Sequence, residues 1–400
     1  MKILLIANKV PYPPKDGGAI ATLNLTRGLS AAGNEVTVLA MNTLKHHIDL
    51  EEIPLSLRQT ARFCLVAVPA PISPAGALVN LLFSRQPYNA VRFISKVFKK
   101  ELIRLLQETD FDVVQLEGLY LCPYIPLIRS HSRALISYRA HNIEHEIWAR
   151  TASQARGLKR WYVDNLAARI RRFEQYWINR YDLLVPITRR DAGQLGLMGN
   201  SRPVQVTPAG IDTEALTPDK TNLEFPSVFH IGSLEWGPNQ EGLVWFLKNC
   251  WPRLSQKYPG LRFYVAGRNA PAWLIRKMEL PGVVFLGEVD DAQRFMNARA
   301  IMVVPLFSGS GMRVKIIEGM ALEKTIVSTP IGAEGLEVHH GRQLLIASRE
   351  EEFLAAVEEL VENRILFDEI GKEAGRFVRE NFDNLALADS LTAFYQKHLQ

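Results

Sequence analysis

Two cations and a carboxylate follow a glycine-rich loop in the second half of the chain, at a spacing suited to binding a phosphate. Ile301–Pro305 is apolar and ends at a proline, which is typical of a buried strand. After the turn-prone Ser308–Gly311, apolar residues recur at helical spacing from Met312. A helix that opens on a glycine loop presents free backbone N–H groups and a positive dipole end, and both attract phosphate. The stretch therefore predicts a strand, a loop and a helix around an anion site.

Charged residues at the start of this helix favour the same chemistry. Arg313 and Lys315 place two cations in its expected first turn, where the helix dipole disfavours cations unless an anion is bound. Glu318 lies one turn after Lys315 among apolar neighbours, so its carboxylate needs a partner, such as ligand hydroxyls. The alternative is a surface loop with a Lys315–Glu318 helical pair of little energy.

Composition limits the class of protein. The chain has 400 residues, of which 47% are apolar and 22% charged, so we expect two or three globular domains. The net charge of +5 is compatible with anionic small molecules or an anionic membrane surface, and we expect no nucleic-acid partner. Three widely separated cysteines without metal spacing indicate a cytosolic protein with reduced thiols. The apolar runs are shorter than a membrane span.

The chain begins with the pattern of a βαβ unit. Lys2–Ala7 is predicted as a buried parallel strand, followed by a proline-rich loop, Gly17-Gly18 and a helix. A right-handed crossover to the strand Glu35–Ala40 would place this loop at the carboxyl end of the sheet. Gly17 and Gly18 allow a ligand to approach the backbone closely, although turn geometry alone also explains them.

A histidine stands where parallel sheets place ligand-binding groups. His141 comes just after the predicted strand Ala134–Arg139, although a lone histidine is often structural. His145 follows four residues later, but the zinc pattern H-E-x-x-H requires a glutamate directly after the first histidine. Asn142 occupies that position, so we reject a metal site here.

Two basic amphipathic segments, Phe83–Gln107 and Arg156–Arg180, are predicted as helices. The simpler interpretation is that they are solvated helices packed on a sheet. The alternative is that their basic faces, around Lys96–Arg104 and Arg169–Arg172, dock on an anionic membrane.

The βα alternation restarts after an irregular linker at Thr213–Pro226. A short strand, Val204–Thr207, is predicted before it. Repeated βα units then predict a second parallel sheet. Three of its strands end at glycine-containing turns: Val228–Ile231 at Gly232, Arg262–Ala266 at Gly267-Arg268, and Thr325–Ser328 at the segment that contains Glu334-Gly335-Leu336.

These elements, taken in order, resemble one family over nearly the whole chain. The sequence is similar to GT-B fold glycosyltransferases of the retaining family 4 type, glycosyltransferase group 1. The matching elements are Gly17-Gly18, His141-Asn142, Pro208–Asp212, Gly232, Gly267-Arg268, Gly309–Ala321 and Gly332–Leu336. The resemblance implies an α/β fold of two Rossmann-like domains with parallel sheets facing across a cleft. Residues 1–215 with a C-terminal helix at 381–400 would bind the acceptor, and residues 225–380 the nucleotide sugar.

The resemblance also implies an activity. A cytoplasmic hexosyltransferase, peripheral on the inner membrane face, would transfer a sugar with retention from a UDP- or GDP-sugar. The acceptor would be a glycan or a lipid-linked molecule, and the enzyme would take part in cell-surface polysaccharide synthesis. The resemblance implies no cofactor and no metal, because cations and helix N–H groups stabilise the leaving diphosphate.

Roles for single residues follow from the same resemblance. His141 would contact the donor sugar, Arg313 and Lys315 would face the diphosphate, and Glu318 would bind the ribose hydroxyls. The other implied donor-binding residues are Gly17, Gly18, Gly232, Arg268, Gly309, Ser310, Gly311, Glu334, Gly335 and Leu336.

The chain departs from the family pattern in two places. Ser310 stands where the pattern E-x7-E has a glutamate that usually meets the donor sugar. The arginine and lysine that many members carry after Gly232 are also absent, and Arg268, Arg313 and Lys315 are the cations that could replace them. The alternative function is therefore a catalytically inactive GT-B scaffold that binds nucleotide or a partner transferase. A third alternative is a non-transferring GT-B enzyme, such as a sugar-nucleotide epimerase or a phosphorylase.

Overall fold

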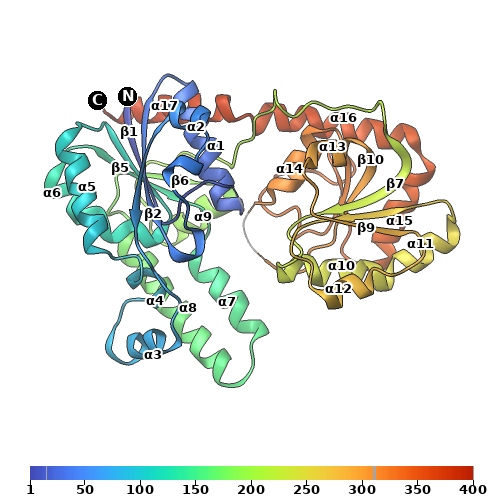
Figure 1. The fold of residues 1–400 in the computed structure, drawn as a ribbon, viewed down its shortest axis with the longest axis horizontal. Coiled ribbons are helices and arrows are strands. Elements are labelled where there is room, and N and C mark those ends of the chain that lie inside the picture. The colour runs from blue at the N-terminus through green and yellow to red at the C-terminus, as the bar shows by residue number, and fades with distance from the viewer. Residues whose placement is uncertain (15, 310–311, 400) are drawn as a thin grey trace. The chain divides into compact units, whose positions relative to one another are not determined.

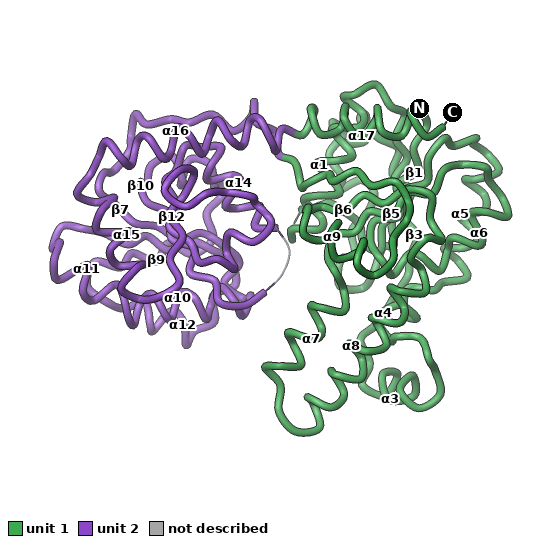
Figure 2. The backbone as a smooth tube through the Cα atoms, turned by 180° about the vertical axis from the view of Figure 1, so that it is seen from behind, with its two compact units in different colours: residues 1–210, 384–400 green, residues 211–383 purple. Residues whose placement is uncertain are grey.

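The chain forms two units, each built on its own six-stranded sheet. The structure is a computed structural model that describes residues 1–14, 16–309 and 312–399. Unit 1 contains residues 1–210 and 384–400, and unit 2 contains residues 211–383 (Figures 1 and 2). The C-terminal helix thus belongs to the first unit, although the chain has already passed through the second.

The sheet of unit 1 has the strand order β3-β2-β1-β4-β5-β6, with every neighbouring pair parallel. Its strands are β1 (Lys2–Ala7), β2 (Glu35–Asn42), β3 (Arg62–Ala67), β4 (Val113–Glu117), β5 (Leu135–Ala140) and β6 (Leu183–Pro186). The central strands are rich in Val, Ile and Leu because helices cover both faces of the sheet. The strand order reverses between β1 and β4, and ligands bind beside such reversals at the carboxyl ends of the strands.

Helices cover both faces of this sheet. One face packs against α1 (Gly17–Ala31), α2 (Leu55–Thr60) and α17 (Asn384–Leu399), and their apolar side chains share a core with β1 and β2. The other face packs against α5 (Lys96–Glu108), α6 (Ile125–His131), α8 (Gly157–Trp177) and α9 (Arg189–Leu197). Unit 1 also contains α3 (Pro74–Phe83), α4 (Tyr88–Val91), α7 (Glu144–Gln154) and the short 3-10 helices η1 (Leu44–His46), η2 (Leu50–Glu52) and η3 (Leu119–Tyr124).

Unit 2 repeats the same topology. Its parallel strands run in the order β12-β11-β10-β7-β8-β9, so the reversal lies between β7 and β10. The strands are β7 (Glu224–Ile231), β8 (Phe263–Ala266), β9 (Val283–Gly287), β10 (Arg299–Val304), β11 (Thr325–Ser328) and β12 (Leu345–Ile346). The helices are α10 (Gly237–Asn249), α11 (Trp251–Lys257), α12 (Ala272–Lys277), α13 (Ala292–Asn297), α14 (Val314–Ala321), α15 (Glu350–Glu362) and α16 (Arg364–Asn381).

Some local predictions were wrong. The expected strand at Val204–Thr207 is reduced to a single bridge between Val204 and Leu184. Prolines at 203 and 208 bracket this segment, and a proline cannot donate to a ladder. The basic segment Phe83–Gln107 is not one helix: it is interrupted near Pro87, and α5 begins only at Lys96, where Ser95 caps the Phe98 amide at 3.3 Å.

Candidate functional site

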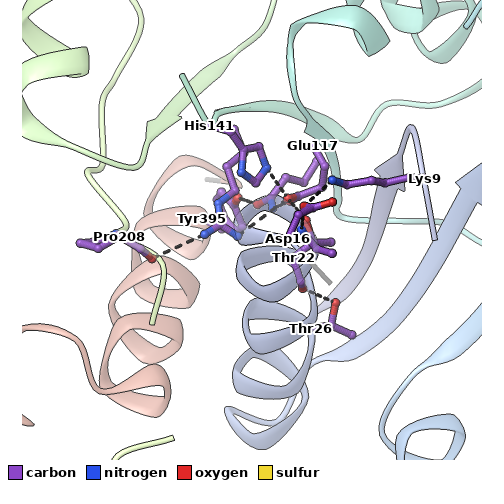
Figure 3. A network of polar contacts seen from close by, with 11 residues as sticks. Lys9, Asp16, Thr22, Thr26, Glu117, His141, Pro208 and Tyr395 are labelled. Atoms are coloured by element: carbon purple, nitrogen blue, oxygen red, sulfur yellow. Dashed lines mark hydrogen bonds and ion pairs between the residues drawn. The ribbon is translucent and has the colours of Figure 1, made fainter. Parts of the chain in front are cut away.

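Polar side chains of unit 1 converge on Glu117, the last residue of β4 (Figure 3). The Glu117 side chain is 2% exposed, and its Oε2 lies 2.8 Å from Nε2 of His141, just past the end of β5. The same oxygen accepts a hydrogen bond of 2.8 Å from the Thr22 hydroxyl of α1. The Gln115 side-chain amide donates to the other oxygen. Three elements therefore position one buried carboxylate beside the reversal in strand order.

The charge of this carboxylate fixes the role of the histidine. Burial alone would raise the pKa of Glu117, but the Arg139 guanidinium, with Nη1 at 3.9 Å, and the hydrogen bond to His141 lower it to about 2. Because the ionised carboxylate can only accept, Nε2 of His141 must carry a proton. In neutral His141 the other nitrogen, Nδ1, then has a lone pair that can accept a hydrogen bond from a ligand hydroxyl.

The N-terminus of α1 lies after β1 at the same edge of the sheet. Asp16 caps it by accepting from the Ala19 amide at 3.0 Å, and the same oxygen pairs with Lys9 Nζ at 2.5 Å. A Cβ at Gly18 would lie 3.4 Å from Lys9 Nζ, which is ordinary contact, and Gly18 is not among the glycines with positive φ. Neither crowding nor a positive φ therefore requires glycine at 18.

The C-terminal helix reaches this network from the opposite end of the sequence. The Tyr395 hydroxyl of α17 is buried, lies 2.9 Å from the Ser137 hydroxyl and donates to the Gln115 side-chain oxygen. Gln115 in turn donates to Glu117. Sequence reasoning missed these partners. The sequence feature that could have revealed them is a polar residue in the middle of each of two apolar strands, Gln115 and Ser137.

In unit 2, the predicted donor-binding residues also follow the carboxyl ends of strands. Gly232 comes after β7 and Gly267-Arg268 after β8, and the two turns approach each other closely. A Cβ at Gly267 would lie 1.9 Å from the Gly232 carbonyl oxygen, so a side chain cannot be added there without moving the backbone. Arg268 extends beyond this contact, with Nε 3.8 Å from a Glu235 carboxylate oxygen.

A buried histidine at the reversal in unit 2 was not anticipated from the sequence. His230, near the end of β7, is 2% exposed, and its Nδ1 donates to the Val303 carbonyl of β10 at 3.0 Å. Burial lowers its pKa, so the ring is neutral at physiological pH and Nε2 is an acceptor. Among the described residues, Nε2 has no hydrogen-bond partner. The sequence feature that could have revealed this residue is a single histidine in the apolar run of β7.

The loop before α14 holds Arg313 against an indole. The Arg313 guanidinium carbon lies 5.3 Å from the centre of a Trp236 ring. Gly309 takes φ +103°, and a Cβ there would lie 3.0 Å from the same indole. The helix itself begins at Val314 instead of Met312, so Arg313 precedes its first turn. The predicted site residues Ser310 and Gly311 lie outside the described residues.

Within α14, Lys315 and Glu318 contact each other. Lys315 Nζ lies 2.6 Å from Glu318 Oε2, and the two side chains are 40% and 20% exposed. This is the helical pair that the alternative interpretation of the stretch predicted. Such pairs contribute about 0.2–0.5 kcal/mol, so a ligand with stronger charge or hydrogen-bonding groups can displace it at little cost.

The turn after β11 supplies the remaining predicted residues. Gly335 takes φ +83°, which favours glycine, and Leu336 is buried within unit 2. The Thr329 hydroxyl donates to the Leu306 carbonyl beyond β10 and accepts from the Gly332 amide at 3.1 Å. These bonds hold the turn that carries Glu334 beside the segment that leads to α14.

Among residues 1–14, 16–309 and 312–399, no group of three or more His, Cys, Asp or Glu side chains could hold a metal ion. None of the helices described there is both long and apolar enough to cross a membrane.

Two family profiles match the chain, one on each unit. The first, described as Glycosyltransferase Family 4, matches residues 15–215, and the second, Glycosyl transferases group 1, matches residues 225–363. The chain belongs to the group 1 glycosyltransferases. This confirms the family and the α/β, GT-B class of fold with two Rossmann-like domains.

Known proteins are similar to this glycosyltransferase along almost the whole chain. An uncharacterized 44.6 kDa protein in the cps region of Klebsiella pneumoniae is 24% identical over 408 residues, covering 98% of each chain. Sucrose-phosphate synthase from Thermosynechococcus elongatus superposes with a TM-score of 0.74 at 16% identity, covering 99% of this chain and 98% of that one. Anabaena Alr3699/HepE, solved in complex with UDP, gives a TM-score of 0.72 at 14% identity, covering 99% and 100%. At these identities the solved structures establish the fold.

Proposed function

We propose that this glycosyltransferase moves a hexosyl group from a UDP- or GDP-sugar, with retention of configuration, to a glycan or lipid-linked acceptor. The observation that carries the proposal is the carboxyl edge of the unit 2 sheet. The turns at Gly232 and Gly267 approach each other closely at this edge. The N-terminus of α14 lies at the same edge, and it carries the cations Arg313 and Lys315. Backbone approach, helix N–H groups and positive charge are what a nucleoside diphosphate requires.

In this proposal the leaving diphosphate is stabilised by the protein alone. Negative charge develops on the diphosphate as the bond to the sugar breaks, and prepositioned cations and N–H groups lower the energy of that state. Lys315 would leave Glu318 for the diphosphate when the donor binds. The Glu318 carboxylate would then accept hydrogen bonds from the ribose hydroxyls. The reaction would need no metal ion.

His141 would act on the sugar from unit 1. Its Nε2 is held by the ionised Glu117, so its Nδ1 is the atom that would accept a hydrogen bond from a sugar hydroxyl. This contact would orient the sugar while it is transferred, and retention is the stereochemistry that the family resemblance implies. The acceptor would bind among the polar groups of unit 1 near Gly18.

Two similar proteins support a proposal for the biological setting. The Anabaena protein was solved with UDP, which favours a uridine nucleotide donor, and the Klebsiella protein is encoded in a cps region, which favours cell-surface polysaccharide synthesis. A cytoplasmic enzyme on the inner face of the membrane would meet both a soluble nucleotide sugar and a lipid-linked acceptor.

The test is a panel of UDP- and GDP-sugars with the purified protein. Donors that raise the melting temperature are then assayed for release of nucleoside diphosphate, with and without a chelator, and the anomeric configuration of any transfer product is determined by NMR. We expect stabilisation by one donor and chelator-resistant turnover. Nucleotide binding without turnover on any acceptor would support the inactive scaffold instead. Conversion of the sugar on its nucleotide would support an epimerase.

A further inference from the structure

Helix α3 exposes an apolar surface to solvent. Every residue of α3 is exposed or half-buried. Residues 63–84, which include the helix, contain no charged side chain. The apolar side chains exposed here are Ile72, Leu78, Val79, Leu82 and Phe83, and Phe83 alone is 83% exposed. A contiguous apolar surface in water is unfavourable and marks a site that binds something.

Polar contacts hold this helix in place without covering its apolar side chains. Arg169 of α8 donates to three carbonyl oxygens at the C-terminal end of α3, those of Asn80 at 3.1 Å, Leu81 at 2.7 Å and Ser84 at 2.8 Å. At the other end, the Ser73 amide donates to the Tyr88 hydroxyl at 3.0 Å. The orientation of α3 is therefore fixed by its ends.

Cations and an aromatic ring accompany the helix. In both views of the backbone, α3 and α8 lie together in an arm that extends away from the sheet of unit 1 (Figures 1 and 2). The first turns of α8 expose Leu158 and Trp161. Residues 69–85 and 156–161 contain four cations and no acidic residue: Arg85, Arg156, Lys159 and Arg160.

We propose that α3 and the first turns of α8 dock unit 1 on an anionic lipid bilayer. Apolar side chains bordered by tryptophan and by lysine and arginine are the pattern of helices that lie in a membrane interface. The apolar side chains of α3 enter the boundary between headgroups and acyl chains, and the cations contact lipid phosphates. The surface contains none of the residues assigned to the donor, so docking is independent of the proposed transfer.

This surface differs from the basic faces that the sequence suggested, around Lys96–Arg104 and Arg169–Arg172. Arg169 is engaged with the backbone of α3, and Arg104 pairs with both Glu101 and Glu108. These guanidinium groups are already satisfied within the protein, so they add little attraction to lipid. The apolar component that interfacial binding needs is found on α3.

The test is flotation of the full-length protein with vesicles of phosphatidylcholine alone or mixed with phosphatidylglycerol. The wild-type protein should float with the anionic vesicles, and less at high salt. Leu82→Ser/Phe83→Ser should weaken binding by about tenfold or more, since two apolar side chains no longer enter the lipid. Arg85→Ser/Lys159→Ser should weaken it by about fivefold per cation and reduce the salt dependence. These side chains are exposed, so circular dichroism and melting should match the wild type.

Matched controls distinguish binding through this surface from nonspecific adsorption of the protein to vesicles. Leu197→Ser/Ile365→Ser removes two equally exposed apolar side chains elsewhere, and Lys96→Ser/Lys100→Ser removes two exposed cations of α5. Both should bind like the wild type. Wild-type binding by Leu82→Ser/Phe83→Ser, or equal flotation with neutral vesicles, would overturn the proposal. So would a dimer on size exclusion that the same variant abolishes, because a second copy would then cover α3.

Discussion

His141 Nε2 and Glu117 Oε2 lie 2.8 Å apart at the ends of two neighbouring strands. The carboxylate is ionised and almost fully buried, so it fixes both the tautomer and the direction of the imidazole. A histidine at a strand end is thereby converted from a mobile side chain into an oriented hydrogen-bond acceptor. This relationship makes Glu117 a positioning residue for the proposed reaction, and it can be tested separately from the fold.

Removal of the Glu117 carboxylate should affect stability and catalysis differently. Glu117→Ala leaves Arg139 buried without its counter-charge and should lower the free energy of unfolding by about 3–5 kcal/mol in urea titrations. Glu117→Gln keeps the hydrogen-bond acceptor and should cost less. In that variant we expect kcat to fall while KM for the donor stays near the wild-type value. Glu101→Ala, which breaks an exposed pair with Arg104, is the control and should change stability by less than about 1 kcal/mol.

Acid should weaken unit 1 through the same carboxylate. The pKa of Glu117 in the fold is about 2, below its ordinary value of 4.5. The stabilisation is therefore complete above about pH 4.5 and is lost as the pH falls towards 2. Unfolding measured from pH 6 downwards should show a smaller acid dependence in Glu117→Gln than in the wild type. An identical dependence in both proteins would contradict the ionised state of Glu117.

Glu144, the first residue of α7, should produce the opposite dependence on pH. Burial, together with the nearby Glu174 carboxylate, raises its pKa to about 7, although the Tyr120 hydroxyl donates to it at 2.8 Å. The folded state therefore binds more protons than the unfolded state between about pH 4.5 and 7, and stability falls as the pH rises through that window. Glu144→Gln should match the wild type at pH 5 and melt at a higher temperature at pH 8. A lower melting temperature at pH 8 would show that the ionised form is the stabilising one.

Lys315 and Glu318 should give different kinetic defects. Lys315→Ala removes charge that faces the leaving diphosphate in the proposed site, so kcat should fall by about 10²–10³-fold. Glu318→Ala removes acceptors for the ribose in both ground and transition states, so it should chiefly raise KM for the donor. Glu318→Gln should be milder. The pair is half-buried and of low energy, so melting should change little, and wild-type transfer by folded Lys315→Ala would exclude α14 as the diphosphate site.

Tyr395 connects the C-terminal helix to the site and offers a test of that connection. Tyr395→Phe keeps the ring but leaves the buried Gln115 oxygen without its donor, which should cost about 1–3 kcal/mol of stability. Tyr176→Phe, at an exposed ring on α8, is the matched control. Equal melting temperatures for the two variants would show that the buried hydroxyl contributes nothing.

Much of the fold is encoded in local pattern. Apolar runs that end at glycine or proline predicted most of the parallel strands, because a strand buried on both faces must be apolar along its length. The same reasoning placed His141 just past a strand end, as the structure has it. It missed β12, which has two residues, and β3. A two-residue strand is too short for any periodicity, and it is specified by its pairing with β11.

The sequence by itself determined the family, the two parallel sheets and the order of most of their strands. Only the tertiary structure decided which side chains meet. Thr22, Glu117, His141 and Tyr395 come from α1, β4, the end of β5 and α17, and they form one hydrogen-bonded network. Likewise, Arg169 donates hydrogen bonds to the backbone of α3, although more than eighty residues of chain separate the two. Buried polar groups must find partners wherever the folded chain brings them, and no local pattern records those distant neighbours.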